Sequence, residues 1–227
     1  MLFQRFAKIV LRLFMRVFLQ VRVTGLEHLP RSGRLIVMMN HIHALDPILV
    51  TAVLPRDITI MSKIENLRLP FFGWIVRWYG SFPIRRGEAD LQAMRQALQV
   101  LEKEGALLMA PEGTRSKTGG LQAGHDGMTL VATRTDCPIL PVAISGDEAF
   151  NRNLKRLRRT PVQITIGELF VFTNREGRPS RAQLRQMTRE AMYRLSALLP
   201  APYRGVYAGL FQATTELIRP YRPGETP

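Results

Sequence analysis

Short apolar runs alternate along most of this chain with stretches of helical period. The apolar runs have the length of buried strands and lie at 35–39, 58–61, 106–110, 139–144 and 162–166. The helical stretches lie at 47–54, 88–104, 126–133 and 180–199, with Ser180 as the N-cap of the last and Gly105 after the second. This alternation predicts an α/β fold, with a mixed sheet flanked by helices in a domain that spans residues 24–200.

The first 23 residues predict an N-terminal amphipathic helix. Its cations recur at steps of three and four and form one basic stripe: Arg5, Lys8, Arg12 and Arg16. They interrupt the apolar run and no small-residue cleavage site follows, so neither a membrane span nor a signal peptide fits. A wide apolar face with a narrow basic stripe suits the membrane interface, with the cations at the lipid head groups. The alternative is a helix packed on the domain with the stripe in water.

Two other segments stand apart from the alternating pattern. Residues 69–79 contain both tryptophans, and this density of aromatic side chains fits either core packing or a second surface for membrane or acyl chains. Residues 201–227 are rich in proline, tyrosine and arginine and are predicted to form a C-terminal extension.

The charge balance points to an anionic partner. The chain has 227 residues, with 32 Lys+Arg against 18 Asp+Glu and a formal net charge of +14. Such a charge favours nucleic acid, an anionic membrane surface or a phosphorylated substrate, without choosing among them. One cysteine excludes an intrachain disulfide, and four histidines with one cysteine do not make a plausible structural zinc site. We therefore expect no metal.

The strongest candidate for chemistry is the stretch from Asn40 to Pro47, which directly follows an apolar run. His41 and Asp46 are five residues apart, a spacing that puts side chains roughly 140° apart on a helix and on opposite faces of a strand. The two can meet only across a bend, and a strand followed by Asp46 as N-cap and Pro47 as first helical residue supplies one. They could equally be ordinary turn residues.

Two more polar bends follow apolar runs, at 85–86 and at 112–115. Strand ends in an open α/β sheet can converge on one crevice, so the three bends predict one site with an imidazole, two carboxylates and three arginines. A histidine oriented by an aspartate is a good general base, and arginines bind phosphate through forked hydrogen bonds. No G-x-S-x-G nucleophile and no Walker-type loop is present. Direct attack by an activated hydroxyl is therefore favoured, on either an acyl or a phosphoryl donor, although the lack of an acidic metal cluster disfavours the latter.

Four blocks in this region resemble the motifs of glycerolipid acyltransferases. They are the His-x4-Asp pattern of His41 and Asp46, the segment Gly80-Ser81-Phe82-Pro83-Ile84-Arg85-Arg86, the segment Pro111-Glu112-Gly113-Thr114-Arg115-Ser116, and the segment Pro138-Ile139-Leu140-Pro141-Val142. They occur in the family's order across roughly residues 25–145. The branch they resemble most is that of the 1-acyl-glycerol-3-phosphate acyltransferases.

This resemblance implies a fold, a reaction and a set of site residues. His41 would deprotonate the free hydroxyl of lysophosphatidic acid, Asp46 would orient it, and the oxygen would attack an acyl-CoA or acyl carrier protein thioester to give phosphatidic acid. The residues implied to bind the glycerol phosphate are Arg86, Glu112, Gly113, Thr114 and Arg115. The family is metal-free, needs no cofactor and is membrane-associated, which implies a monotopic protein on the cytoplasmic face of a membrane.

Three residues depart from the family pattern, and other functions stay open. His43 stands where serine is common, Ala110 where phenylalanine is usual, and His125 where lysine is frequent. The same chemistry on another lysolipid or on glycerol 3-phosphate is one alternative. A non-catalytic basic protein that binds membrane or nucleic acid is another, but aromatic residues are not interleaved with the basic run 152–159, so nucleic acid is not expected as a partner.

Overall fold

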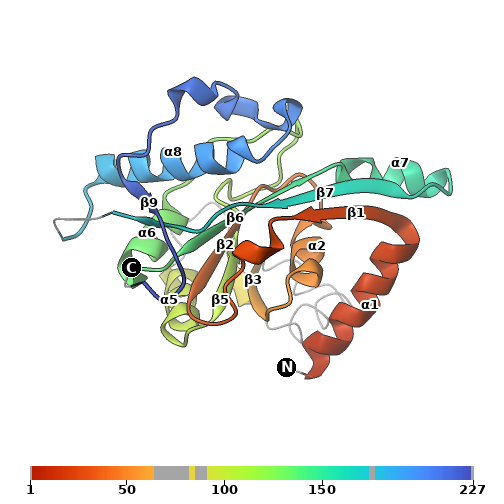
Figure 1. The fold of residues 1–227 in the computed structure, drawn as a ribbon, viewed down its shortest axis with the longest axis horizontal. Helices are drawn as coiled ribbons and strands as arrows, with labels where there is room; N and C mark the ends of the chain where they lie inside the picture. Colours follow the sequence, from red (N-terminus) through yellow and green to blue (C-terminus); the bar gives the residue numbers. More distant parts are fainter. Residues whose placement is uncertain (1, 64–81, 85–90, 174–176, 226–227) are drawn as a thin grey trace.

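A computed structural model describes residues 2–63, 82–84, 91–173 and 177–225 and confirms the α/β fold with helices on a mixed sheet (Figure 1). The sheet order is β1-β7-β6-β2-β5-β3-β4, with β8 paired to β6 and β9 paired to β8. Its strands are β1 (Leu19–Thr24), β2 (Leu35–Met39), β3 (Ile58–Lys63), β4 (Phe82–Ile84), β5 (Ala106–Met109), β6 (Ile139–Ser145), β7 (Thr160–Ile166), β8 (Phe170–Phe172) and β9 (Ile218–Pro220).

The centre of the sheet is parallel, as an α/β alternation requires. β2 pairs in parallel with both β5 and β6, and β5 pairs in parallel with β3. The β6–β7 pair is antiparallel, which makes the sheet mixed. The polar bends after β2 and β5 therefore emerge at the same edge of the sheet, where α/β folds place their sites.

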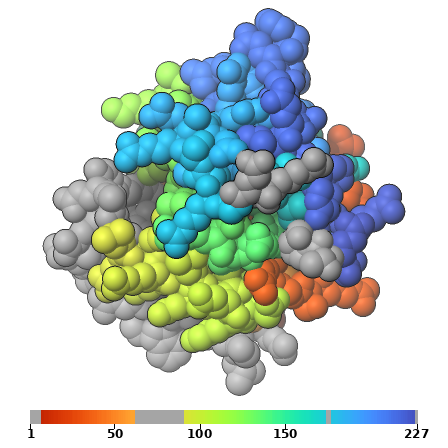
Figure 2. Space-filling view, turned by 90° about the vertical axis from the view of Figure 1, so that its left-hand side faces the viewer, coloured from red at the N-terminus to blue at the C-terminus, as the bar shows by residue number. Residues whose placement is uncertain are grey.

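Helices cover both faces of the sheet and divide the core into two layers. They are α1 (Leu2–Phe18), α2 (Asp46–Val53), α5 (Leu91–Glu102), α6 (Gly127–Thr135), α7 (Phe150–Lys155) and α8 (Arg181–Ala197). Along β2, Leu35, Val37 and Met39 pack in one layer with α1 and α2. Ile36 and Met38 pack in the other with α5, α6 and α8. Figure 2 shows the second face, with light-blue α8 above α5 and α6.

The N-terminal helix is present but ends earlier than predicted. The expected helix over residues 1–23 stops at Phe18, and Leu19–Thr24 forms β1, which runs parallel to β7. Alternate β1 residues are more deeply buried, as expected for a strand with one face on the core. The strand was not predicted because its alternating pattern directly follows the helical pattern of residues 2–18.

Part of the basic stripe of α1 is bonded to the protein and does not face outward. The ammonium of Lys8 donates hydrogen bonds to the carbonyls of Leu54 (3.3 Å) and Arg56 (2.6 Å), and Arg12 donates to Ala52 (2.9 Å). These carbonyls lie at the C-terminal end of α2 and in the three residues after it, where backbone acceptors lack helical partners and cations are favourable. Both sequence-based interpretations put the stripe in contact with water or lipid head groups, and for Lys8, which is buried, this is wrong.

The exposed part of α1 carries several large apolar side chains. Its exposed large side chains are those of Ile9, Val10, Leu13, Val17 and Phe18. Among the residues that the structure describes, no helix is both long enough and apolar enough to cross a bilayer. The helix therefore uses Lys8 and Arg12 for bonds within the protein, and its exposed face carries these five apolar side chains together with Arg16.

The C-terminal part of the chain packs on the sheet domain. Ser180 begins α8 with the predicted cap: its hydroxyl accepts from the Gln183 N–H, and the Gln183 side chain accepts from the Ser180 N–H. Buried Glu190 of α8 accepts from the Leu217 N–H (3.0 Å) and from Thr214 (2.9 Å). Residues 201–220 thus lie on α8 and supply β9, while the predicted aromatic surface at 69–79 lies outside the described residues.

Candidate active site

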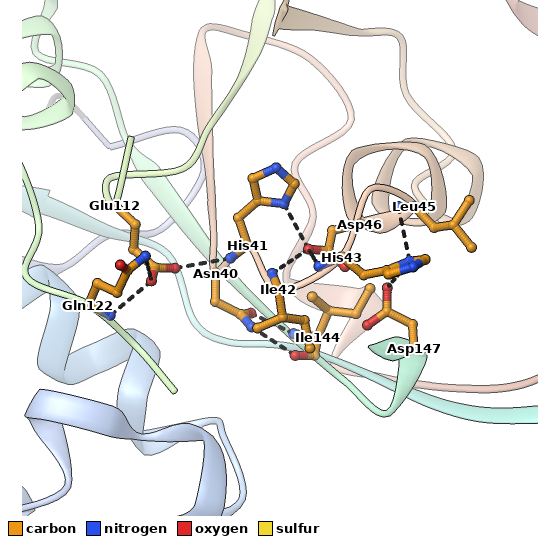
Figure 3. Close-up of polar contacts among 10 residues, drawn as sticks. All are labelled: Asn40, His41, Ile42, His43, Leu45, Asp46, Glu112, Gln122, Ile144 and Asp147. Atoms are coloured by element: carbon orange, nitrogen blue, oxygen red, sulfur yellow. Dashed lines mark hydrogen bonds and ion pairs between the residues drawn. The ribbon is translucent and has the colours of Figure 1, made fainter. Parts of the chain in front are cut away.

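The bends after β2 and β5 meet, as their positions in the sequence predict. The His41 N–H donates to Oε1 of Glu112 at 3.0 Å, and the His41 carbonyl accepts from the Ser116 N–H at 2.7 Å. The third bend of the prediction, with Arg85 and Arg86, lies outside the described residues. Two of the three polar bends therefore form one site (Figure 3).

His41 and Asp46 form the imidazole–carboxylate pair that the bend was predicted to allow. Nδ1 of His41 lies 2.8 Å from Oδ2 of Asp46, and both side chains are buried. A carboxylate acceptor at Nδ1 fixes that nitrogen as the protonated one, so the lone pair of the neutral ring is on Nε2. This arrangement suits a general base.

Asp46 holds the bend together, which differs from the expected helix cap. Its Oδ2 accepts the backbone N–H groups of Ile42 (2.6 Å) and His43 (2.8 Å), and Asp46 itself is the first residue of α2. Burial raises the pKa of Asp46 to about 6, and these N–H groups oppose the rise by favouring the charged form. One carboxylate oxygen therefore both fixes the loop and faces the imidazole.

Glu112 connects the two bends from inside the protein. Its Oε1 accepts from the His41 N–H, its Oε2 accepts from the Gln122 N–H at 2.8 Å, and only 2% of its surface is exposed. Burial raises its pKa, while the two N–H groups act in the opposite direction. With both oxygens occupied by backbone donors, the structure places this carboxylate as a support for His41.

The residues after Glu112 lie on the surface of the same edge. Gly113, Thr114 and Arg115 are exposed, and Gly113 has a φ of 66° in the left-handed region. A Cβ at this position would come within 3.1 Å of the His125 ring, so glycine suits both the turn and the close approach. The Ser116 N–H donates to the His41 carbonyl, and Arg115 directly precedes Ser116, so the backbone of Arg115 lies close to the site.

Asn40 has a structural role that its place in the motif did not reveal. Its side-chain N–H donates to the Ile144 carbonyl (2.9 Å), and its side-chain oxygen accepts the Ile144 N–H (2.8 Å). The amide thus extends the β2–β6 pairing by one residue and holds the strand end next to His41. An asparagine directly before the histidine was the only signal for it.

A third carboxylate, missed in the sequence, lies behind Asp46. Asp147 directly follows β6 and Gly146, is fully buried, and has its Oδ2 3.8 Å from Nδ1 of His43. Gly146 has a φ of 95°, and a Cβ there would clash with the Pro161 carbonyl at 2.4 Å, so this turn requires glycine. No spacing rule connects Asp147 with a bend about a hundred residues earlier in the chain. In the described residues, no group of three or more His, Cys, Asp or Glu side chains is arranged so that it could hold a metal ion.

Comparison with known proteins identifies the family of this fold and site. The sequence pattern of the family described as Acyltransferase matches residues 20–145, more than half of the chain. The chain belongs to the acyltransferase family. The matched range includes β2, β5, the His41–Asp46 bend and Glu112.

Curated relatives of this family member match the chain over part of their length. It is 28% identical over 134 residues to the 1-acyl-sn-glycerol-3-phosphate acyltransferase of Borreliella burgdorferi, covering 58% of this chain and 54% of the relative. It is 29% identical over 132 residues to the chloroplastic enzyme LPAT1 of Arabidopsis thaliana, covering 57% and 37%. The chain therefore spans about half or less of the length of these curated relatives.

A solved structure and a relative with another acceptor complete the comparison. The crystal structure of the 1-acyl-sn-glycerophosphate acyltransferase PlsC from Thermotoga maritima superimposes with a TM-score of 0.63 at 26% identity, covering 86% of this chain and 76% of that one. A lyso-ornithine lipid O-acyltransferase of Pseudomonas aeruginosa is 35% identical over 127 residues, covering 56% of this chain and 47% of the relative. The fold is thus shared with a solved 1-acyl-sn-glycerophosphate acyltransferase.

Proposed function

We propose that this acyltransferase moves a fatty acyl group from an acyl thioester to the free hydroxyl of 1-acyl-glycerol 3-phosphate, giving phosphatidic acid. The observation that carries the proposal is the buried His41–Asp46 pair at the end of a parallel strand, in a family whose relatives carry this activity in their names. The donor is acyl-CoA or acyl carrier protein, and the chemistry needs no metal or other cofactor.

His41 acts as the base in this reaction. Its Nε2 takes the proton of the acceptor hydroxyl, the oxygen attacks the thioester carbonyl carbon, and the carbon–sulfur bond breaks as the tetrahedral intermediate collapses. The imidazolium then returns the proton to the departing thiolate. Asp46 keeps the ring in the required tautomer and stabilises its positive charge. A base of this kind contributes about 10²–10⁴-fold in rate.

Arg115 is the partner of the acceptor phosphate at the same edge. Arg115 is exposed one residue before the Ser116 that bonds to His41, and a guanidinium matches a phosphate through paired hydrogen bonds. We assign Gly113, Thr114 and Arg115 to the acceptor side, together with Arg86, whose assignment rests on the resemblance alone. Glu112 would act on the acceptor only indirectly, by placing His41.

We further propose that the uncovered face of α1 lies in the membrane surface. Three ring contacts connect this face of α1 with the loop that carries His41. The ring centroids are 5.0 Å apart for Phe18 and Phe14, 5.8 Å for Phe14 and Phe150, and 6.3 Å for Phe150 and His43. A helix that presents large apolar side chains to the outside fits a monotopic protein that takes its acceptor from the bilayer, and we expect this on the cytoplasmic face.

The turn after α7 extends this surface. Leu19 pairs with Thr160, so the end of α1 and the turn that precedes β7 lie side by side, as Figure 1 also shows. Leu154, in the last turn of α7, and Leu157, on the turn that follows, are exposed among the basic side chains of the run 152–159. Exposed leucines beside cations suit an anionic lipid surface, where each Lys or Arg contributes about 1 kcal/mol.

Liposome binding tests the membrane proposal. Replacing Leu13 and Val17 with serine removes side chains that each contribute up to about 1.5–3 kcal/mol when they leave water. We expect the double variant to stay in the supernatant when vesicles containing anionic lipid are sedimented. Leu91→Ser, which alters an equally exposed leucine on α5, is the matched control and should sediment like the wild type. Unchanged sedimentation of the double variant would refute a role for this face.

Acceptor choice is the test of the function itself. One labelled acyl thioester is offered to the purified protein with lysophosphatidic acid, glycerol 3-phosphate, lysophosphatidylcholine or a lyso-ornithine lipid. We expect lysophosphatidic acid to be acylated with the highest kcat/KM. Preference for the lyso-ornithine lipid would favour the second candidate, motivated by the 35% identity to that enzyme and by His125. Steeply salt-dependent nucleic-acid binding without thioester consumption would contradict both.

A further inference from the structure

Three carboxylate oxygens behind the His41–Asp46 pair lack ordinary hydrogen-bond donors. Neither oxygen of Asp147 nor Oδ1 of Asp46 is reached by an N–H or O–H donor within the described part of the chain, although all three atoms are buried. Two ionised carboxylates at this depth would each carry a desolvation cost and would also repel each other. Native proteins rarely leave such groups without a partner.

The two carboxyl groups satisfy each other if one of them is protonated. They lie within hydrogen-bonding reach, which tends to lower the pKa of Asp46 and to raise that of Asp147. Burial is the largest influence on Asp147 and, with the Asp46 charge, raises its pKa to about 9. Carboxyl pairs that share a buried site keep one proton between them for the same reason.

We propose that Asp46 and Asp147 share one proton, which resides on Asp147 and is donated to Oδ1 of Asp46. Asp147 is then a positioning residue of the site. Asp46 keeps its negative charge, with Oδ2 engaged by His41 and by two backbone N–H groups, and with Oδ1 engaged by the acid. The fixed carboxylate in turn holds the His41 ring. The effect on acyl transfer rests on the proposed function, whereas the shared proton does not.

Several charged or titratable groups face this pair. His41 and His43 approach from the loop after β2, with Nδ1 of His43 3.8 Å from Asp147. Glu112 acts from the loop after β5, Glu148 from the turn of Asp147 itself, and Tyr203 from the C-terminal segment, where its hydroxyl donates to Glu148 at 2.7 Å.

The acidic neighbours favour the protonated form of Asp147. His43 alone favours its charge, but Nδ1 of His43 already lies 3.4 Å from the Leu45 N–H, in the orientation of an acceptor. A neutral His43 beside a neutral acid is consistent with both contacts. The rival arrangement is an ion pair of protonated His43 with ionised Asp147.

Infrared spectroscopy decides between the two arrangements without any activity assay. A protonated carboxyl group absorbs at the C=O stretch, separate from carboxylate bands. We expect the wild type at pH 7 to show a protonated-acid band that Asp147→Asn lacks and that the exposed-residue control Asp136→Asn retains. In the wild type this band should fade as the pH rises through about 9. If the pH 7 spectra of wild type and Asp147→Asn agree in this region, the shared proton is refuted.

Acyl transfer provides the second readout. The asparagine of Asp147→Asn still donates an N–H to Asp46 at every pH, so kcat at pH 7 should stay within about threefold of the wild type. The wild-type kcat should fall at alkaline pH as the second carboxylate forms, and Asp147→Asn should lack this fall. Asp147→Ala, with no donor, should lose about tenfold in kcat at pH 7 with little change in acceptor KM. An identical alkaline fall in wild type and Asp147→Asn would refute the positioning role. If the asparagine variant does not fold, the pH titration of the wild-type band still tests the proton.

Discussion

Replacing Glu112 with glutamine separates two roles for this residue. The family resemblance implies that it binds the acceptor, whereas its contacts indicate that it positions His41. Glutamine keeps one carbonyl oxygen, which can accept the N–H of either His41 or Gln122, while its amide N–H₂ faces the other donor. One buried backbone N–H is then left without an acceptor, and the charge that strengthened both bonds is gone.

The size of the effect follows from these contacts. A hydrogen bond to a charged group contributes about 1.5–3 kcal/mol, and the relief of a buried charge, visible as the raised pKa of Glu112, offsets part of that loss. We therefore expect a loss of about 1–3 kcal/mol in the free energy of unfolding. At about 2–4 °C per kcal/mol for a chain of this size, the melting temperature should fall by several degrees. A shift of His41 by about 1 Å can cost about 10²-fold in kcat.

Steady-state kinetics with lysophosphatidic acid as the varied substrate provides the assay. Glu112→Gln should lower kcat strongly while acceptor KM stays within about threefold, since the carboxylate makes no contact that a bound acceptor would replace. Glu102→Gln removes the same charge from the exposed face of α5 and should leave both parameters unchanged. An acceptor KM that rises at least tenfold with kcat preserved would contradict the positioning role and favour the role implied by the resemblance.

Two further predictions concern stability. Lys8→Met leaves the Leu54 and Arg56 carbonyls without their donor and should lower the free energy of unfolding in urea by about 1.5–3 kcal/mol. Arg16→Met, on the exposed part of the same helix, should lower it little. Equal losses in the two variants would refute the role of Lys8 as a donor to these carbonyls. The raised pKa of Asp147 means that the folded protein binds this proton more tightly than the unfolded chain, so its contribution to stability declines as the pH rises from about 4 to about 9. Asp147→Asn should therefore become more stable relative to the wild type with increasing pH, and a constant difference across pH 5–9 would contradict this linkage.

Much of the fold is readable from periodicity because buried strands and amphipathic helices have distinct patterns. The strands at 35–39 and 139–144 and the capped helix from Ser180 are confirmed within a residue or two. β1 was missed because its alternation directly continues the helical pattern of α1. β8 and β9, at three residues each, are too short to show a period, and only their pairing with the rest of the sheet defines them.

Some contacts of the candidate site were predictable from the sequence, and others were not. The meeting of His41 and Asp46 was predictable because their spacing allowed only a bend, and strand order brought Glu112 to the same edge. The inward direction of Glu112 was not predictable, because a carboxylate in a turn gives no sign of which backbone donors it will meet. Asp147 was missed because its contact with Asp46 depends on the β2–β6 pairing and on the turn at Gly146.

The helix α1 shows how a pattern of charges can leave the partner of an individual side chain undecided. Four cations at helical spacing are compatible with either side of α1 facing the protein. The carbonyls of Leu54 and Ala52 accept hydrogen bonds from Lys8 and Arg12, while large apolar side chains of the same helix are exposed. Tertiary contacts with α2, which the sequence of α1 does not contain, decided the orientation.

The most direct test of the central claim is acyl transfer by His41→Ala. The variant is purified, its fold is checked by circular dichroism and thermal unfolding, and transfer from a labelled acyl thioester to lysophosphatidic acid is followed in a single turnover. A general base contributes about 10²–10⁴-fold, so the rate should fall by at least about a hundredfold while acceptor binding persists. A folded His41→Ala protein that forms phosphatidic acid at the wild-type rate would contradict the assignment of His41 as the base.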